Sequence, residues 1–388
     1  MKLRHLLDRY IEEGNAGDPL PSYAQLSAEY NVSRPTADRA LQDLVTSGRV
    51  VRMHGKGIFI SHRAKQKTVA LVFGNDVDIV MSSTYPRILL GGCRAHTLEH
   101  NQRFLTFYGV PQSDREAEDA PNFHDLAQSL RAKEIDGIVY CRHGGDSGQL
   151  IWLAEQGVPI VSADPLPASI RSGSFASVRI DWRGLVRMGV DALARQDCRE
   201  IGLISQRAVG DVQDNDVCLD YFREAVKERG LVYDSDWVWD HLKYMPSDMA
   251  YTVSHHEAQG FQAMSDMWKR LNAEGRRLEG IVVTDDFLTR GCVFAAYALG
   301  LKIGKDIKIA THANRGSDAL LRFEHDLILM EIDLHELADA LIQTLTQMMK
   351  GKPFEKDRLL TSHLRLPHAS ACRFGYCSSG TSITGERI

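Results

Sequence analysis

Apolar residues recur at helical spacing three times near the start of the chain, and two short apolar runs follow them. We interpret these segments as three helices and two strands at residues 3–11, 22–30, 33–45, 50–53 and 58–61. Ser22 and Ser33 are suitable N-caps for the second and third helices, and Pro35 stands in a first turn, where proline is tolerated. Two helices joined by a tight turn at Asn31 and followed by a hairpin predict a winged helix-turn-helix.

Beyond residue 67 the pattern changes to apolar strands that alternate with helices. The predicted strands are residues 69–74, 103–108, 137–141, 159–163, 176–181, 200–205, 280–284, 306–311 and 327–332. The predicted helices are residues 87–100, 123–132, 183–195, 219–229, 260–273, 287–298 and 334–349. Near-continuous apolar strands separated by helices predict parallel sheets covered on both faces. About 300 residues of this pattern exceed one typical domain, so we expect two α/β lobes.

These patterns divide the chain into four predicted segments. The winged-helix domain covers residues 1–61, and a polar, basic linker covers residues 62–67. The α/β domain covers residues 68–372, and a polar tail rich in Ser, Gly and Thr covers residues 373–388. We therefore expect the N-terminal domain and the α/β domain to fold separately.

Composition is that of an ordinary soluble protein. The 388 residues are 44% hydrophobic and 25% charged, which excludes a mostly disordered or fibrous chain. The longest weakly polar stretch, residues 291–304, is shorter than the about 20 residues that span a bilayer. The first residues lack the apolar core of a signal peptide, so we expect a cytoplasmic protein. Seven scattered cysteines, of which only Cys372 and Cys377 are close, indicate reduced thiols and no metal site.

Charge is unevenly distributed along the chain. Residues 1–65 hold ten Lys or Arg against seven Asp or Glu, whereas the whole chain has a net charge of −5. A basic N-terminal segment joined to an acidic remainder indicates a module that binds a polyanion.

The N-terminal segment also resembles a known family. The stretches that carry the resemblance are Leu20-Pro21-Ser22, Leu26-Ser27, Val32-Ser33-Arg34-Pro35-Thr36, Arg39-Ala40-Leu41, Leu44, Gly48 and Gly55-Lys56-Gly57-Ile58-Phe59. In this order and at this spacing they resemble the GntR-type DNA-binding domain. The resemblance implies that the N-terminal domain binds a double-stranded DNA operator.

The chemistry of these residues agrees with that implication. The exposed backbone N–H groups at the start of the third helix suit a phosphate, and Arg34 there can pair bidentately with guanine in the major groove. Gly55 and Gly57 let the wing approach the DNA backbone closely, and Lys56 brings charge to the minor groove or to a phosphate. The candidate DNA-binding residues are Ser22, Tyr23, Ser33, Arg34, Pro35, Thr36, Arg39, His54, Lys56 and Gly57.

Two positions depart from the GntR pattern. Family members commonly carry Arg where this chain has Asp38, and Glu where it has Tyr23. A carboxylate repels phosphate, but it can accept a hydrogen bond from cytosine N4. Alternatively, Asp38 pairs with Arg34 or Arg39 and holds them in place. The operator sequence therefore stays open.

The remainder of the chain resembles a second family. The stretches that carry this resemblance are Asp136-Gly137-Ile138-Val139, Gly157-Val158-Pro159-Ile160-Val161, Asp164, Asp181, Cys198-Arg199-Glu200-Ile201-Gly202-Leu203-Ile204, Gly260-Phe261-Gln262, Gly280-Ile281-Val282-Val283-Thr284-Asp285-Asp286, Gly291, Ile332-Asp333-Leu334, Leu337-Ala338 and Gly351-Lys352-Pro353. They resemble the effector domain of LacI/GalR-type repressors, which are relatives of periplasmic sugar-binding proteins. Together the two resemblances indicate an AraR-like architecture. They imply a two-lobed periplasmic-binding-protein-like (type I) fold, in which three crossovers join two α/β lobes and the ligand lies in a cleft at the carboxyl ends of the strands.

Polar residues just past the strand ends are the candidate ligand contacts, because carboxylates accept hydrogen bonds from sugar hydroxyls at fixed geometry. These candidates, with one histidine before Gly260, are Asn75, Asp76, Arg142, Asp164, Arg207, His255, Asp285 and His312. Other interpretations stay open. Asp285 is alternatively a helix cap or a surface turn, Asp164 a turn residue, and Asp286 and Asp333 helix caps.

Three positions depart from the LacI/GalR pattern. Cys218 replaces an arginine of many relatives, and Ala313 and Asn314 replace two aspartates that commonly contact sugar. Arg207, Arg142 or the His255-His256 pair are the candidates to compensate. A sugar or sugar derivative is the first expectation, with its identity open.

These observations predict a ligand-responsive transcriptional repressor. We expect a homodimer on a palindromic operator, a carbohydrate effector, no cofactor and no membrane partner. The alternative is an enzyme with a DNA-binding domain that acts on the bound compound. The sequence has no Gly-x-Ser-x-Gly elbow, Walker A loop or His-Glu-x-x-His motif, so we expect no catalysis. An exported sugar receptor is opposed by the basic N-terminal segment.

Overall fold

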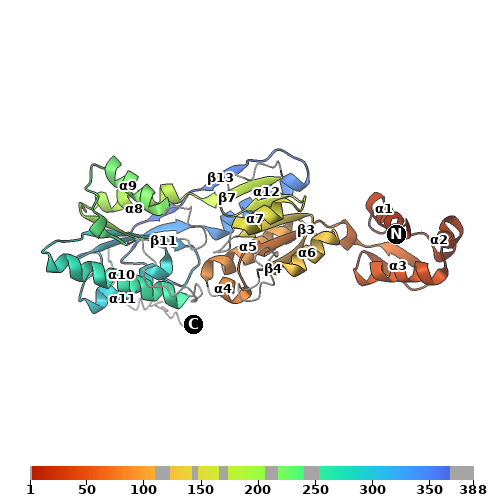
Figure 1. The fold of residues 1–388 in the computed structure, drawn as a ribbon, viewed down its shortest axis with the longest axis horizontal. Helices are drawn as coiled ribbons and strands as arrows, with labels where there is room; N and C mark the ends of the chain where they lie inside the picture. Colours follow the sequence, from red (N-terminus) through yellow and green to blue (C-terminus); the bar gives the residue numbers. More distant parts are fainter. Residues whose placement is uncertain are drawn as a thin grey trace, which may run out of the picture. The chain divides into compact units, whose positions relative to one another are not determined.

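The computed structural model describes residues 2–81, 83–109, 123–141, 147–165, 174–205, 217–239 and 253–367. Contacts divide the chain into a first unit, residues 1–179 with 334–360, and a second unit, residues 180–333 with 361–388 (Figure 1). The chain passes from one unit to the other three times, as the LacI/GalR resemblance implies.

The N-terminal domain is a winged helix-turn-helix, as predicted. Its elements are α1 (Lys2–Glu13), α2 (Tyr23–Tyr30), α3 (Arg34–Thr46), β1 (Val50–Met53) and β2 (Gly57–Ile60). The two strands pair antiparallel and form the wing. Apolar side chains from all five elements form a separate core, which includes Leu7, Ile11, Leu26, Leu41 and Ile60.

Local sequence explains where these helices begin and end. Ser22 forms a capping box with Gln25, in which its hydroxyl accepts from the Gln25 N–H at 3.3 Å and its own N–H donates to the Gln25 side chain at 2.8 Å. Asn31 ends α2 in the left-handed conformation, at φ 51°, and so makes the tight turn. Ser33 caps α3, and Pro35 stands in its first turn.

The predicted linker has local structure of its own. The second wing strand ends at Ile60, one residue earlier than expected, and Ser61 caps a 3-10 turn over His62–Lys65. Ser61 donates from its hydroxyl to the carbonyl of Gly48 at 2.5 Å, and the Lys65 ammonium donates to the carbonyl of Glu12 at 2.9 Å. Lys65 of the predicted linker therefore contacts the N-terminal domain.

The α/β part of the first unit contains a six-stranded sheet in the order β13-β7-β6-β5-β3-β4. The strands are β3 (Thr68–Phe73), β4 (Arg103–Tyr108), β5 (Gly137–Cys141), β6 (Ile160–Ser162), β7 (Phe175–Ile180) and β13 (Asp357–Leu360). The helices are α4 (Val77–Met81), α5 (Thr84–Glu99), α6 (His124–Arg131), α7 (Ser147–Ala154) and α12 (Leu334–Met349). The first five strands in sequence pair in parallel, and β3 and β5 are buried along their whole length.

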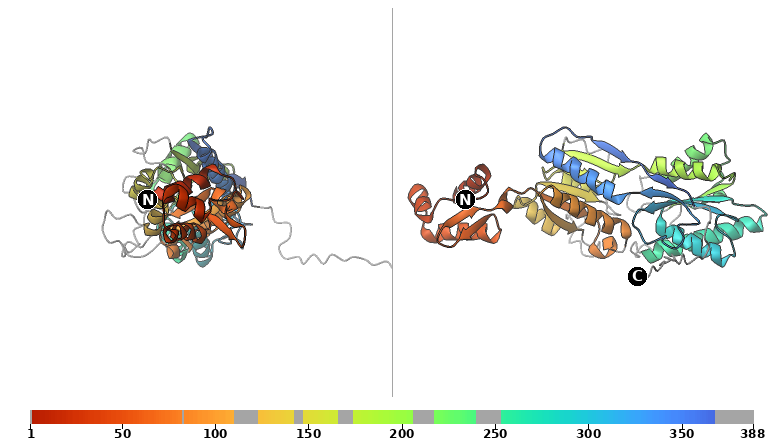
Figure 2. Two further views of the ribbon diagram at one scale, coloured as in Figure 1. Left: turned by 90° about the vertical axis from the view of Figure 1, so that its right-hand side faces the viewer. Right: turned by 180° about the vertical axis from the view of Figure 1, so that it is seen from behind.

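The last segment of the first unit comes from far along the chain. Helix α12 follows the second unit in sequence but packs against α5, and Figure 2 shows it, in blue, beside the orange and yellow elements. The buried side of α12 includes Leu337, Leu341 and Leu345. This segment therefore completes a layer of the first unit.

The second unit contains a six-stranded sheet in the order β14-β12-β11-β10-β8-β9. The strands are β8 (Ile201–Ile204), β9 (Val238–Trp239), β10 (Gly280–Val283), β11 (Lys308–Asn314), β12 (Ile328–Ile332) and β14 (His363–Arg365). The helices are α8 (Trp182–Ala194), α9 (Val217–Glu228), α10 (Val253–Ala273) and α11 (Asp286–Ala298). All its pairs are parallel except that of β14 with β12. Two parallel α/β sheets with helices are thus confirmed.

Some elements differ from the sequence-based expectation. Strands β9, β13 and β14 and helices α4 and α7 were not expected, because they are short or carry little apolar periodicity. Strand β11 continues to Asn314, so the expectation that His312 follows the strand is wrong. Pairing of Asn314 with Ile332 of β12 extends the strand through these polar positions. Within the described ranges, no helix is long and apolar enough to cross a membrane.

Candidate functional sites

The first turn of α3 carries several of the predicted DNA contacts. The Ser33 hydroxyl accepts a hydrogen bond from the Thr36 N–H at 3.4 Å and lies 2.8 Å from the Thr36 hydroxyl. Arg34, Pro35 and Thr36 are exposed, as is Arg39 in the next turn. An exposed helix N-terminus with a guanidinium beside it suits a polyanion.

The wing presents three further predicted DNA contacts at its tip. His54 and Lys56 between the two strands and Gly57 at the start of β2 are exposed, and the Lys56 N–H closes the turn on the Met53 carbonyl at 3.1 Å. Gly55 and Gly57 have φ values of 72° and 117°, in the region that favours glycine. The two glycines therefore allow the backbone to turn at the wing tip, and Lys56 supplies the positive charge there.

Ser22 and Tyr23 lie at the start of α2. The Ser22 oxygen accepts the capping hydrogen bond, which leaves its O–H able to donate to a phosphate. The Tyr23 hydroxyl accepts a hydrogen bond from Arg52 of β1 at 2.8 Å and lies close enough to Asp38 of α3 for that carboxylate to raise the Tyr23 pKa. The alternative in which Asp38 pairs with Arg34 or Arg39 is not observed, because no ion pair joins Asp38 to either arginine among the described residues. This Tyr23–Asp38–Arg52 network was not predicted.

In the first unit, three predicted ligand residues follow strand ends. Asn75 and Asp76 come after β3 and Asp164 after β6, on either side of β5 in the sheet, and all three are half-buried. Parallel strands end at one edge of a sheet, so these residues share that edge.

Tyr85 is a residue of this edge that the sequence analysis missed. Burial raises the pKa of the Tyr85 hydroxyl well above its usual range, and the neighbouring Cys141 and Asp164 add to the shift. Tyr85 belongs to α5 and lies near Asp164 and the last residue of β5, and its hydroxyl therefore stays protonated.

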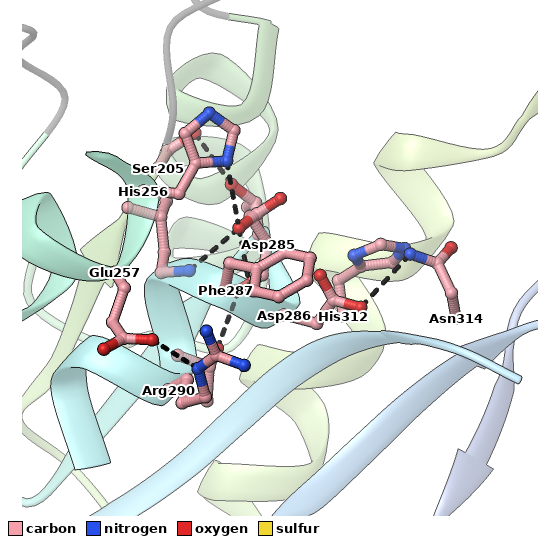
Figure 3. Close-up of polar contacts among 12 residues, drawn as sticks. Ser205, His256, Glu257, Asp285, Asp286, Phe287, Arg290, His312 and Asn314 are labelled. Carbon is pink, nitrogen blue, oxygen red and sulfur yellow. Dashed lines mark hydrogen bonds and ion pairs between the residues drawn. The ribbon is translucent and has the colours of Figure 1, made fainter. Parts of the chain in front are cut away.

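In the second unit, Asp285 follows β10 and is the N-cap of α11. One carboxylate oxygen accepts from the backbone N–H groups of Phe287 at 2.9 Å and Leu288 at 2.8 Å. The alternative that makes Asp285 a helix cap is therefore observed. The same oxygen lies 3.6 Å from Nδ1 of His256, which stands on α10 (Figure 3).

His256 and Asp285 shift each other's protonation. Burial lowers the pKa of His256, but the hydrogen bond to Asp285 and the charges of Asp285 and Asp286 outweigh it and raise the pKa above its ordinary value. Burial raises the pKa of Asp285, but the hydrogen bond and charge of His256 outweigh it and lower the pKa. The pair is therefore an ion pair while His256 holds its proton.

His312 and Asn314 lie on one face of β11, two residues apart. His312 is 5% exposed, and its ring centroid is 5.3 Å from that of Trp182, the first residue of α8. Burial lowers the pKa of His312 to about 4, although the charge of Asp285 opposes the shift. The two ring nitrogens of His312 and Oδ1 of Asn314 have no hydrogen-bond partner in the described structure. Buried polar atoms of this kind call for a ligand or water.

Asp286 lies next to these atoms and is 2% exposed. Its carboxyl group accepts from the Asn314 amide at 3.3 Å and from the Ser317 hydroxyl at 3.0 Å. Burial, with the charge of Asp285, raises its pKa to about 7. The alternative that makes Asp286 a helix cap is wrong, because Asp285 holds that position.

A cavity of about 230 Å³ adjoins Asp286 within the second unit. It is lined by Asp286, Ala313, Asn314, Arg315, Gly316, Ser317, Leu320, Glu324, Leu329, Glu331 and Arg365. Arg365 pairs with Glu324 and Glu331, each at 2.9 Å, so one guanidinium is shared by two carboxylates on that side of the cavity.

For three of the predicted ligand residues, the position of the side chain is not described. Arg142 and Arg207 lie outside the described residues, and of His255 only the helical backbone at the start of α10 is described. Of the other five, the structure brings Asp285 and His312 together, and His256, Asp286 and Trp182 join them. Among the described residues, no three His, Cys, Asp or Glu side chains are placed to hold a metal ion.

A winged helix-turn-helix followed by a periplasmic-binding-protein-like α/β domain defines a class of DNA-binding regulators with a ligand-binding domain. Residues 2–60 match the model of the gntR family of bacterial regulatory proteins. Residues 190–366 match the model of the periplasmic binding protein-like domain. The chain therefore combines a domain of the gntR type with a periplasmic-binding-protein-like domain.

The relatives of the two parts differ. A stretch of 59 residues is 37% identical to the probable fructoselysine utilization operon transcriptional repressor of Escherichia coli K12, an alignment that covers 15% of this chain and 24% of that repressor. The chain thus spans about a quarter of the length of the first curated relatives it matches.

Solved structures show the fold of the larger part. The regulator CelR, in complex with cellobiose, is 17% identical with a TM-score of 0.61, covering 90% of this chain and 100% of that one. The transcription regulator CcpA of Lactococcus lactis is 18% identical with a TM-score of 0.56, covering 78% of this chain and 98% of that one. At these identities the likeness concerns the fold.

Proposed function

We propose that this protein is a transcriptional repressor whose affinity for operator DNA changes when a small molecule binds its α/β domain. The N-terminal domain binds the major groove with the first turn of α3 and the minor groove or a phosphate with the wing. The observation that carries this proposal is the exposed start of α3, where Arg34 stands beside the helix N-terminus, together with Lys56 at the wing tip. A homodimer would place two such helices on the half-sites of a palindrome.

The effector in this proposal is a sugar or sugar derivative. The strand ends of the second unit offer acceptors at Asp285 and Asn314 and a neutral imidazole at His312, with the ring of Trp182 beside it. Neutral hydroxyls suit such acceptors, and an aromatic ring suits the apolar face of a sugar. Asn75, Asp76, Asp164, Arg142, Arg207 and His255 are the further proposed contacts.

Selection from randomised DNA duplexes with the full-length protein tests the DNA-binding part. We expect enrichment of a palindromic motif, and release of that DNA by at least one member of a panel of free sugars and sugar phosphates. Failure to enrich any motif would contradict the DNA-binding function. Conversion of an added compound into a product by the purified protein would favour the alternative of an enzyme with a DNA-binding domain.

A further inference from the structure

Asp38 stands one helical turn after Arg34 on α3, at the boundary between the buried and exposed sides of the helix. Residues four apart in a helix are neighbours on one side. Arg34 is exposed and Asp38 is half-buried, whereas Ala37 and Leu41 face the core of the N-terminal domain. Arg34 and Asp38 therefore lie on the same side of α3, the side that the proposed function places in the major groove.

The Asp38 carboxylate lies beside the Tyr23 hydroxyl, which is itself positioned by a hydrogen bond from Arg52. Arg52 of β1 donates from Nη2 to the Tyr23 hydroxyl oxygen at 2.8 Å, so the Tyr23 O–H is left to donate to Asp38. Burial raises the pKa of Tyr23, and the hydrogen bond to Asp38 raises it further, so the hydroxyl keeps its proton near neutral pH. The Tyr23 ring packs against the N-terminal core, which fixes the position of the hydroxyl.

A carboxylate in this position selects its partner by hydrogen-bond polarity. An ionised carboxylate only accepts hydrogen bonds, whereas phosphate oxygens and the major-groove edge of guanine are themselves acceptors. The donors in the major groove are the amino groups of cytosine and adenine. Adenine also presents the acceptor N7 beside its amino group, which repels a carboxylate, so cytosine is the better partner.

We propose that Asp38 recognises the N4 amino group of a cytosine in the operator, and that Tyr23 and Arg52 are positioning residues for its carboxylate. The inference rests on the proposed DNA-binding function. Four residues of α-helix span about 6 Å, and base pairs are about 3.4 Å apart. The cytosine therefore lies within about two base pairs of the base that Arg34 contacts.

Base preference measured for matched variants tests this assignment. Motifs are selected from randomised duplexes with the full-length wild type and with Asp38→Asn, Asp38→Ala, Tyr23→Phe and Asp43→Asn. Asp43 is an exposed carboxylate on the same helix, 3.8 Å from Arg4, and serves as the control. Thermal unfolding of each variant checks that its N-terminal domain is folded.

The expected results differ from one variant to the next. The wild type prefers cytosine at one position of each half-site by about tenfold or more. Asp38→Asn moves that preference to adenine, because Asn pairs with N6 and N7 of adenine. Asp38→Ala loses the preference at that position alone and binds unrelated DNA at least as tightly, since a charge that repels phosphate is gone. Tyr23→Phe weakens the cytosine preference with the rest of the motif unchanged, and Asp43→Asn keeps the wild-type motif.

Two outcomes would overturn the inference, and they are distinguishable. If the wild type, Asp38→Asn and Asp38→Ala all enrich the same clear motif, Asp38 does not recognise a base, and the proposed DNA-binding function still holds. If the wild type enriches no motif, both the role of Asp38 and the proposed DNA-binding function are contradicted.

Discussion

Gly260 of α10 and Gly291 of α11 bring the backbones of these two helices into direct contact. A Cβ atom on Gly260 would lie 1.9 Å from the carbonyl oxygen of Leu288, and one on Gly291 would lie 1.9 Å from that of Glu257. His256 stands one turn before Gly260, and Asp285 is the N-cap of α11. The close approach of the helices therefore sets the separation of the His256–Asp285 pair.

Gly291→Ala is expected to destabilise the second unit by more than about 2 kcal/mol, because the new methyl group meets rigid backbone and forces the helices apart. The control is Gly91→Ala in α5, where a Cβ would meet nothing within 4 Å and alanine favours the helix by about 0.5–1 kcal/mol. Urea denaturation measures both. Equal stability of the two variants would show that α10 and α11 separate without cost.

Replacement of Asp285 separates its two roles. Asp285→Asn keeps a good N-cap but removes the charge that faces His256, whereas Asp285→Ala removes both. We expect Asp285→Ala to be less stable than Asp285→Asn by about 1 kcal/mol, the usual value of an N-cap. If Asp285 also binds effector, both variants lose release of DNA by the sugar that releases the wild type, and both still bind DNA. Unchanged release with a lowered melting temperature would leave Asp285 a structural cap only.

Stability is expected to depend on pH through His256. Its pKa is raised in the folded protein, so its contribution to the free energy of unfolding is complete below its ordinary pKa of 6.5 and is lost as the pH rises through the raised value. His256→Gln should therefore destabilise the protein more at a pH of about 5.5 than at about 9. His325→Gln, at an exposed position of the same unit, is the control. A difference between wild type and His256→Gln that does not change with pH would contradict the pairing.

Arg34 and Lys56 are expected to differ in how they affect DNA binding. Arg34→Ala weakens binding to the selected operator by about 1–3 kcal/mol and relaxes base preference at one position. Lys56→Ala weakens binding to all sequences and reduces the salt dependence. Lys305→Ala, an exposed charge in the second unit, is the control. Gel-shift titrations at several salt concentrations measure these effects, and wild-type affinity and slope for both variants would exclude α3 and the wing from the interface.

A fragment that begins at Gln66 is expected to fold and to bind effector without binding DNA. It keeps the ion pair of Lys67 with Asp136 at 2.6 Å and the hydrogen bond from the Arg103 N–H to the Lys67 carbonyl at 2.8 Å. The contacts of Ser61 and Lys65 with the N-terminal domain lie outside it. Circular dichroism and a thermal melt check folding, and a molten fragment would place the domain boundary elsewhere.

The sequence predicts most of the fold because its signals are local. Apolar runs such as residues 137–141 and caps such as Ser22 and Ser33 determine elements within a few residues. Strand β11 extends past its apolar residues because β12 pairs with it. The local sequence of β11 does not reveal this pairing. The predicted domain boundaries stay predictions.

The candidate site is less predictable because it joins residues that are far apart in sequence. Asp285 was expected at a strand end, but its partner was not, since the helix pattern was placed from Gly260 and α10 begins at Val253. Only the longer helix brings His256 near Asp285. The contact of Tyr23 with Arg52 likewise depends on how the wing packs beside α2.

The return of the chain to the first unit has a consequence for its synthesis on the ribosome. Helix α12 and strand β13 belong to the first unit but follow residue 333, so that unit stays incomplete until almost the whole chain has emerged. Residues 2–60 form a continuous domain with its own core, which can fold as soon as it leaves the tunnel. A gene truncated shortly before codon 334 would therefore produce a chain with an intact N-terminal domain and an incomplete α/β domain. Under the proposed function, such a chain would compete for the operator in a cell that also makes the full-length protein.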